Sequence, residues 1–239
     1  MRHSLIVKLI SFLLLCPLSI NSALSANMNN QKLGNKLEEI LNQKKYNLLK
    51  TFFLKNSFLD FENHYLEYRK DYKDSKWKIT TISNHPNKIY LNIQIKSKRD
   101  IGNQIYNLHS KQTVKIETFK NKIKSYKVIN EESILNTEGS PLIVKIIAPN
   151  EVQTGERYEV NLIVEKPLDN SLIASGMVVL KNREDLKISK EKFGIKPNLS
   201  GGLFKYVQAP LIPGFQTISA IITHPKGIYS LTKTIKVGL

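Results

Sequence analysis

The spacing of apolar residues changes once along this chain, and that change limits its fold more than any other feature. Within residues 31–55 apolar side chains recur every three or four positions, which is the period of an α-helix. A break near residues 42–47 predicts two helical pieces. From residue 76 onward the pattern becomes alternation, which is typical of strands with one buried face. The chain is therefore neither all helix nor all strand.

The first half of the chain predicts a mixed α+β unit. Residues 89–95 carry an apolar side chain at every second position, and two more strands are predicted at 104–119 and 122–133, separated by residues that favour turns. A helical segment followed by antiparallel strands indicates an α+β domain, which we place at residues 26–136.

The second half of the chain predicts an all-β unit. Residues 136–141 show no periodicity and contain turn-forming residues, so we place a domain boundary there. Seven short strands within about a hundred residues are typical of an immunoglobulin-like β-sandwich, here spanning residues 141–239. The expected strands lie at 142–148, 157–165, 173–181, 186–193, 202–208, 215–223 and 229–237.

The N-terminal residues have the order of a secretory signal peptide. Arg2 and Lys8 precede the apolar run 9–15, and small residues follow it. We predict a signal peptide over residues 1–25, cleaved after Ser25. The mature chain is then expected outside the cytoplasm, either periplasmic or secreted.

Cys16 is the only cysteine, and it lies within the predicted leader. Lipid attachment at this residue after cleavage is the alternative interpretation, although the bulky Leu15 before it disfavours that pathway. With the leader removed, the chain has no disulfide and no thiolate chemistry. No later apolar run reaches membrane-spanning length, so no transmembrane segment is expected after cleavage.

The charge of the chain leaves two interpretations open. The formal net charge is +16, and removal of Arg2 and Lys8 lowers it to +14 because no acidic residue precedes residue 27. An anionic partner would account for the excess, and so would the codon bias of an AT-rich genome, which enriches Lys, Asn and Ile. Most of the positive residues are lysine rather than arginine, and arginine is favoured for phosphate contacts. Together with export, this argues against a nucleic-acid partner.

Several features of residues 31–135 carry a resemblance to a known family. These are the leading helices, Trp77 at the start of the first long strand, and the late hairpin at 117–123 followed by residues 131–134. In this order the segment resembles the nuclear transport factor 2-like superfamily. The resemblance implies helices on a curved antiparallel sheet that encloses a conical pocket. The expected fold is thus an α+β cone followed by an all-β immunoglobulin-like sandwich.

The resemblance also implies candidate site residues. Enzymes of this superfamily use acidic, tyrosine, histidine or arginine side chains inside the cone for proton transfer, which makes Asp60 and His109 the catalytic candidates. Trp77, Tyr90 and Tyr106 are the aromatic candidates for lining a ligand pocket. No two histidines are spaced three or four residues apart beside a carboxylate cluster, so neither a metal nor another cofactor is expected.

Two functions follow from these observations. The leading hypothesis is a non-catalytic exported binding or protein-interaction module, whose partner is a protein or a small ligand in the N-terminal domain. The alternative is a small-molecule lyase or isomerase that uses acid and base chemistry in the cone. The resemblance further implies a possible homodimer through the open sheet face. A pocket filled by its own aromatic side chains would favour the first hypothesis.

Overall fold

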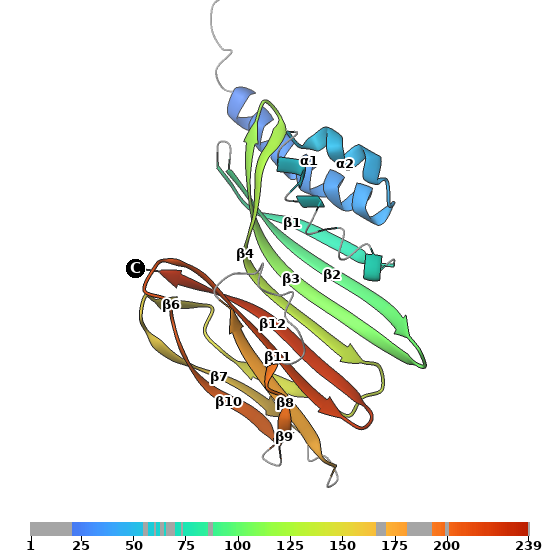
Figure 1. Ribbon diagram of the computed structural model, residues 1–239. Helices are drawn as coiled ribbons and strands as arrows, with labels where there is room; N and C mark the ends of the chain where they lie inside the picture. The colour runs from blue at the N-terminus through green and yellow to red at the C-terminus, as the bar shows by residue number, and fades with distance from the viewer. Residues whose placement is uncertain are drawn as a thin grey trace, which may run out of the picture.

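The computed structural model describes residues 21–54, 57–59, 61–62, 65, 70–72, 74–85, 88–165, 171–180, 193–198 and 201–238. Figure 1 shows their arrangement. The helices and strands are α1 (Asn21–Asn42), α2 (Tyr46–Phe52), β1 (Lys76–His85), β2 (Lys88–Ile101), β3 (Gln104–Phe119), β4 (Lys122–Thr137), β5 (Val144–Ile147), β6 (Glu151–Gln153), β7 (Arg157–Val164), β8 (Ile173–Leu180), β9 (Lys196–Asn198), β10 (Gly202–Gln208), β11 (Gly214–His224) and β12 (Gly227–Gly238).

The local predictions from apolar spacing are confirmed. Helix α1 ends at Asn42 and α2 begins at Tyr46, which is the predicted break. Strands β3 and β10 begin and end where the sequence predicted them, and β4, β7, β8, β11 and β12 differ from their predicted bounds by a few residues at most. The strand predicted at 186–193 lies almost entirely outside the described residues.

The expected α+β cone is wrong. Strands β1 to β4 do not form a self-contained curved sheet, because they continue into the second half of the chain as one large antiparallel sheet. Its nine strands include the path β1-β2-β3-β4-β12-β11-β8-β9, and β6 pairs in parallel with β12. Strand β12 joins the two parts by pairing with β4 from Tyr229 opposite Asn136 to Lys233 opposite Glu132. Alternation indicates that a strand exists, but it does not indicate which strand will be its neighbour.

The two faces of the sheet over β1 to β4 differ in chemistry. One face, here called the helix face, carries Trp77, Ile79, Ile93 and Ile95, all buried. The other, here called the open face, carries polar residues, and one row across it runs from β1 to β12 as Lys78, Gln94, Lys111, Glu132 and Lys233. Because side chains alternate along a strand, this separation follows from the sequence.

Helix α1 lies against β1 on the helix face (Figure 1). The Glu38 carboxylate accepts a hydrogen bond from the Ile79 backbone N–H at 2.7 Å. The Asn42 side chain both accepts from the Trp77 N–H and donates to the Trp77 carbonyl oxygen, each at 2.8 Å. Gly34 permits this close approach, since a Cβ atom there would lie 3.3 Å from the Thr81 hydroxyl. Helix and strand are therefore held in register by three side-chain bonds.

The space between helices and sheet is filled by the chain's own aromatic side chains. Phe53 and Phe61 lie 4.9 Å apart, Phe61 stacks on Tyr65 at 5.4 Å, and Tyr65 lies 5.4 Å from Trp77, all between ring centroids. These rings are buried together with apolar side chains from α1, α2 and β1 to β4. This region is a packed hydrophobic core.

The C-terminal half is a β-sandwich. A second sheet, in the order β10-β7-β5, covers the continuation of the open face over β12, β11 and β8. The core between the two sheets includes Leu162 from β7, Ile218 from β11 and Leu231 from β12, none more than 1% exposed. The nine-stranded sheet is thus covered by helices on one face over β1 to β4. It is covered by the second sheet on the opposite face over β12, β11 and β8.

A buried lysine ties the two halves together. Lys233 on β12 is 6% exposed, and its Nζ donates to Glu132 Oε2 on β4 at 3.0 Å and to Asn150 Oδ1 at 2.9 Å. Whether residues 26–136 and 141–239 can fold separately stays a prediction.

Candidate interaction surface

The three aromatic candidates from the sequence do not come together. Trp77 is 8% exposed on the helix face, where its ring packs in the core. Tyr90 is half-buried and lies on the open face. Ile95, which pairs with Trp77, is on the helix face, and Tyr90 lies five positions before it on the same strand, so its side chain points the other way. Tyr106 lies on β3 near the β2–β3 turn, where its hydroxyl donates to Gln104 Oε1 at 2.7 Å. They do not line one pocket.

The catalytic candidates have different outcomes. His109 is exposed on the open face, next to Lys96 of β2 and Ile134 of β4. Its chain neighbour Ser110 is buried on the helix face, as strand alternation requires. Asp60 lies outside the described residues. His109 therefore has no aromatic enclosure around it in the described part of the chain.

Sequence reasoning missed a polar row inside the helix face. Gln112 Nε2 donates to Glu131 Oε1 at 3.2 Å, Ser133 donates to the same oxygen at 2.8 Å, and the hydroxyls of Ser110 and Ser133 lie 2.7 Å apart. Glu131 is 3% exposed. The sequence did hold one signal of this row. Gln112 lies in step with Val114 and Ile116, two positions apart each, and so takes a place on β3 where an apolar side chain is expected. The bonds among these residues account for a structural role, since buried polar groups are stable when hydrogen bonded.

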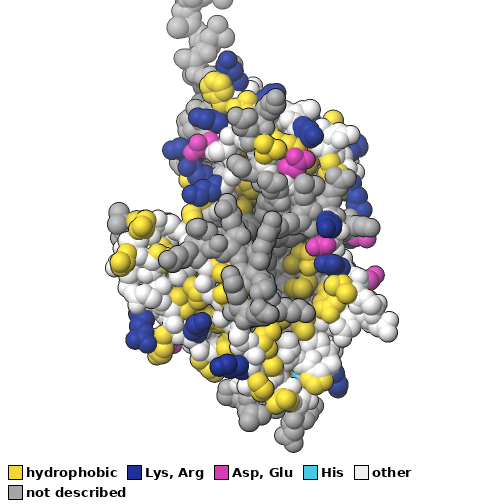
Figure 2. Space-filling view, in the orientation of Figure 1, with side chains coloured by type: hydrophobic (Ala, Val, Ile, Leu, Met, Phe, Trp, Pro, Cys, Tyr) yellow, Lys and Arg dark blue, Asp and Glu magenta, His cyan; other side chains and the backbone are white. Residues whose placement is uncertain are grey.

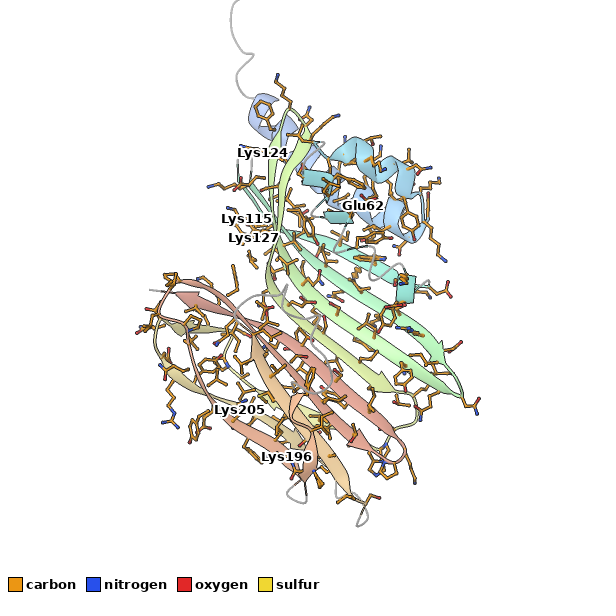
Figure 3. The ribbon with its side chains drawn as sticks, in the orientation of Figure 1. Glu62, Lys115, Lys124, Lys127, Lys196 and Lys205 are labelled. Atoms are coloured by element: carbon orange, nitrogen blue, oxygen red, sulfur yellow. The ribbon has the colours of Figure 1, made fainter. Side chains whose placement is uncertain are left out.

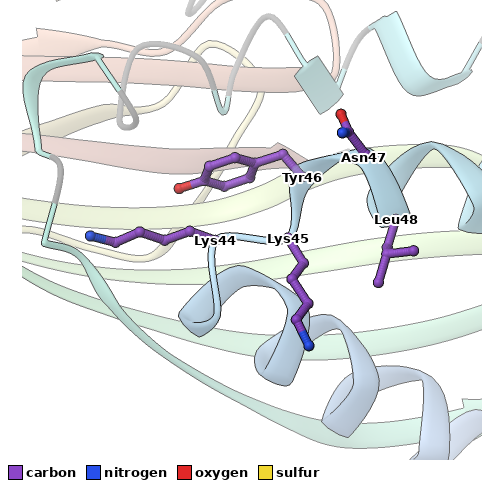
Figure 4. Close-up of a pocket in the computed structure, with 5 residues that line it drawn as sticks. All are labelled: Lys44, Lys45, Tyr46, Asn47 and Leu48. Atoms are coloured by element: carbon purple, nitrogen blue, oxygen red, sulfur yellow. The ribbon is translucent and has the colours of Figure 1, made fainter.

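A surface hollow of about 420 Å³ lies where α1 meets α2 (Figure 4). None of the predicted site residues lines it. Lys44 at its edge forms an ion pair with Asp74 at 3.0 Å. The lining residues are Lys44, Lys45, Tyr46, Asn47 and Leu48. Their side chains point in different directions in Figure 4, and they do not converge on a common centre.

The outer side of the sandwich carries exposed aromatic side chains on β10, and these make it a better candidate for binding than the hollow between α1 and α2. Phe204 and Tyr206 alternate on β10 with inward-facing neighbours and are 58% and 60% exposed. The Arg157 guanidinium of β7 lies 4.6 Å from the centre of the Tyr206 ring. Tyr206 is also hydrogen bonded to Glu159, which raises the pKa of Tyr206 and lowers the pKa of Glu159. The ring is thus fixed on one side by a cation and at its tip by a carboxylate.

The loop that follows β10 extends this surface. Leu211 and Ile212 are 84% and 77% exposed. The loop is tied to the neighbouring turn, because the Gly155 N–H donates to the Pro210 carbonyl at 3.0 Å. Figure 2 shows hydrophobic side chains at the surface over the lower part of the view, where Figure 1 places the sandwich. We call Phe204, Tyr206, Arg157, Leu211 and Ile212 the β10 surface.

The β10 surface could not be identified from alternation. Residues 203–207 read Leu, Phe, Lys, Tyr and Val, so apolar side chains occur at both parities. In the structure Leu203 and Val207 face the core, and the Lys205 ammonium also points inward, donating to the Met177 carbonyl at 3.4 Å. The two largest side chains are left outside. What marks this surface is that β10, a strand at the edge of its sheet, carries apolar side chains on both faces, so that some of them must be exposed.

The described part of the chain shows neither a cluster of metal-binding side chains nor a membrane-spanning helix. No three histidine, cysteine, aspartate or glutamate side chains gather there as metal ligands would. No helix within it has both the length and the apolar character needed to cross a bilayer.

Comparison with known proteins concerns the sandwich half. Residues 139–238 match the model of a domain of unknown function, DUF8623. Neither a nuclear transport factor 2-like nor an immunoglobulin-like family is identified. No curated protein matches the chain.

Proposed function

We propose that this chain is an exported, non-catalytic binding protein whose sandwich half binds a protein partner through the β10 surface. The supporting observation is the Tyr206 and Arg157 pair, an exposed aromatic ring held by a guanidinium. Tyrosine and arginine are enriched among the residues that dominate binding energy at protein interfaces. Exposed apolar side chains beside them, such as Leu211, are typical of such surfaces.

The chemistry of the β10 surface indicates the kind of partner. Apolar side chains need an apolar patch on the partner in order to be removed from water. Arg157 uses one face of its guanidinium against Tyr206, and its N–H groups remain suited to a carboxylate. The described part of the sandwich also carries more lysine and arginine than carboxylates. The partner we propose therefore has an apolar patch with an acidic rim.

The filled core favours binding at the surface over binding in the N-terminal half. The rings of Phe61, Tyr65 and Trp77 occupy the space between helices and sheet. A ligand that entered there would have to displace packed side chains. This packing disfavours a small-ligand site in the N-terminal half.

Photo-crosslinking tests the proposal. A photoreactive phenylalanine analogue at position 206 should give one discrete adduct with another protein, whereas the same analogue at exposed Thr80 on β1 should not. With the captured protein purified, Tyr206→Ala and Arg157→Glu should each weaken binding by about 30-fold or more, because a central interface residue contributes at least about 2 kcal/mol. Leu172→Ala is the control, since Leu172 is 58% exposed outside the β10 surface. Equal adducts at positions 80 and 206, or an affinity that these substitutions leave unchanged, would contradict the proposal.

Export can be tested separately. The order of charged, apolar and small residues before residue 26 supports cleavage by a signal peptidase. N-terminal sequencing of the protein recovered from outside the cytoplasm should begin at Ala26 or Asn27. A lipid-modified N-terminus at Cys16 would show instead that the chain is anchored.

A further inference from the structure

The hairpins β1–β2 and β3–β4 end at the same edge of the large sheet. Lys88, the first residue of β2, pairs with Glu117 of β3, and the β3–β4 hairpin projects beyond this level (Figure 1). The side chains here that belong to the open face, to the β3–β4 turn or to the bulges in β1 and β4 define what we call the hairpin surface. They are Ile82, Lys88, Lys115, Glu117, Phe119, Lys120, Lys122, Lys124 and Lys127.

The hairpin surface is strongly positive. It contains six lysines and a single carboxylate, that of Glu117. Glu117 forms an ion pair with Lys115 at 2.8 Å, and this hydrogen bond is the main reason that the pKa of Glu117 is lowered, with smaller effects from Lys88 and Lys124. Figure 2 shows Lys and Arg side chains gathered beside the hairpin tips, and Figure 3 shows Lys115, Lys124 and Lys127 on the side of the sheet opposite Glu62.

The opposite end of the same strands, at the β2–β3 turn, carries carboxylates beside its positive side chains. The β2–β3 turn exposes Ile101 and Ile105, which are 48% and 41% exposed, but Asp100 lies there and Lys98 forms an ion pair with Glu138 at 2.8 Å. A genome-wide codon bias would raise lysine at both ends. The concentration of lysine at one end is therefore a property of the hairpin surface.

The lysines of the hairpin surface are placed where they repel one another. Lys115 and Lys127 are directly paired across β3 and β4, an arrangement that destabilises a sheet when both charges are alike. Each also has a partner, because Lys115 is bound by Glu117 and the Lys127 ammonium lies 5.1 Å from the centre of the Phe215 ring of β11. Within the described residues, no carboxylate lies at ion-pair distance from Lys120, Lys122 or Lys124. An anionic surface in contact with all of them would relieve this repulsion.

Apolar side chains project from the same surface. Phe119 is 52% exposed at the tip of the β3–β4 hairpin, and Ile82 is 57% exposed on β1. Lys120 and Asn121 have φ angles of 48° and 60°, which form the tight turn that presents Phe119. The Lys120 ammonium lies 5.4 Å from the centre of the Phe119 ring. An exposed ring on a lysine-rich surface matches the boundary between lipid headgroups and acyl chains.

We propose that the hairpin surface docks the protein on a lipid bilayer containing anionic headgroups, with Phe119 inserted at the interface and the lysines against the headgroups. A membrane fits better than nucleic acid for two reasons. The surface has no arginine, and its tip projects instead of forming the basic groove that tracks a nucleic-acid strand. This site is separate from the β10 surface.

Insertion of Phe119 can be measured directly. In the full chain with Cys16→Ser, an environment-sensitive fluorophore is attached through Phe119→Cys or, as the control, through Ile101→Cys at the opposite turn. With vesicles of phosphatidylcholine and phosphatidylglycerol, emission from position 119 should shift to shorter wavelength and emission from position 101 should not. Neither position should respond to phosphatidylcholine alone. An unchanged spectrum at position 119 on the anionic vesicles overturns the proposal.

Charge reversal separates the hairpin surface from the general basicity of the chain. The pair Lys122→Glu and Lys124→Glu should weaken vesicle binding by about 30-fold or more, since each lysine near an anionic surface contributes about 1 kcal/mol. The pair Lys145→Glu and Lys226→Glu makes the same charge change at exposed sandwich positions and should have a much smaller effect. All variants share the N-terminal leader, so its contribution cancels, and thermal melts check that each is folded.

Two further results would overturn the proposal. Equal weakening by both pairs would show that only net charge matters. Binding of a single-stranded oligonucleotide that depends on Lys122 and Lys124, without any vesicle response, would identify nucleic acid as the partner.

Discussion

Replacing Trp77 by alanine should lower the free energy of unfolding by about 3–5 kcal/mol, the usual cost of truncating a large aromatic side chain in a core. The ring is 8% exposed and lies 5.4 Å from Tyr65. Both backbone polar groups of Trp77 are bound by Asn42, so the strand position is fixed and the cavity cannot close by a simple shift. Urea unfolding followed by far-UV circular dichroism measures the loss.

Phe119→Ala is the matched control for Trp77→Ala. Phe119 is also an aromatic strand residue, but it is 52% exposed, and its truncation should change stability by no more than about 0.5 kcal/mol. Similar losses for both substitutions would contradict the assignment of Trp77 to the core. An unchanged unfolding curve for Trp77→Ala would make Trp77 a candidate binding residue again.

Leu231→Ala should cost about 2–5 kcal/mol, because a fully buried leucine in a sheet with strands on both sides leaves a cavity that the backbone cannot fill. Leu231 is 1% exposed and lies between Ile134 of β4 and Ala220 of β11. Leu172→Ala is the control, since that side chain is 58% exposed. A loss below about 1 kcal/mol would contradict the packing described for the sandwich.

The same variant shows whether the two halves unfold together. Trp77 is the only tryptophan, so its fluorescence reports on the N-terminal half alone. Because β12 is hydrogen bonded to β4, we expect Leu231→Ala to lower the midpoint seen by Trp77 fluorescence as well as that seen by circular dichroism. A fluorescence midpoint that stays at the wild-type value would show independent units on either side of residues 136–141.

The local structure of the chain could be predicted because local spacing determines it. Short apolar segments bounded by turn-forming residues identified β3 at 104–119 and β10 at 202–208 with their correct ends. The overall architecture could not be predicted in the same way. The pairing of β4 with β12 depends on residues that are distant in sequence, and nothing in the apolar pattern of 122–133 indicates whether that strand has one neighbour or two. The cone was wrong for this reason.

The site was less predictable than the fold. Trp77 and Tyr90 were grouped because aromatic residues line pockets, but register places them on opposite faces of the sheet. Tyr206 was missed because β10 has apolar residues at both parities, and parity alone does not decide which ones face the core. Only the position of the second sheet settles that question.

The contact between β4 and β12 also imposes an order on synthesis. Glu132 and Lys233 are joined by an ion pair although they are 101 positions apart in the chain. At about 5–20 residues per second, β4 is made roughly 5–20 seconds before the strand that will cover its free edge. Throughout that interval its backbone N–H and C=O groups are open to any other extended chain. A ribosome that stalls before residue 227 therefore leaves a long strand without its partner, and that fragment is a candidate for aggregation.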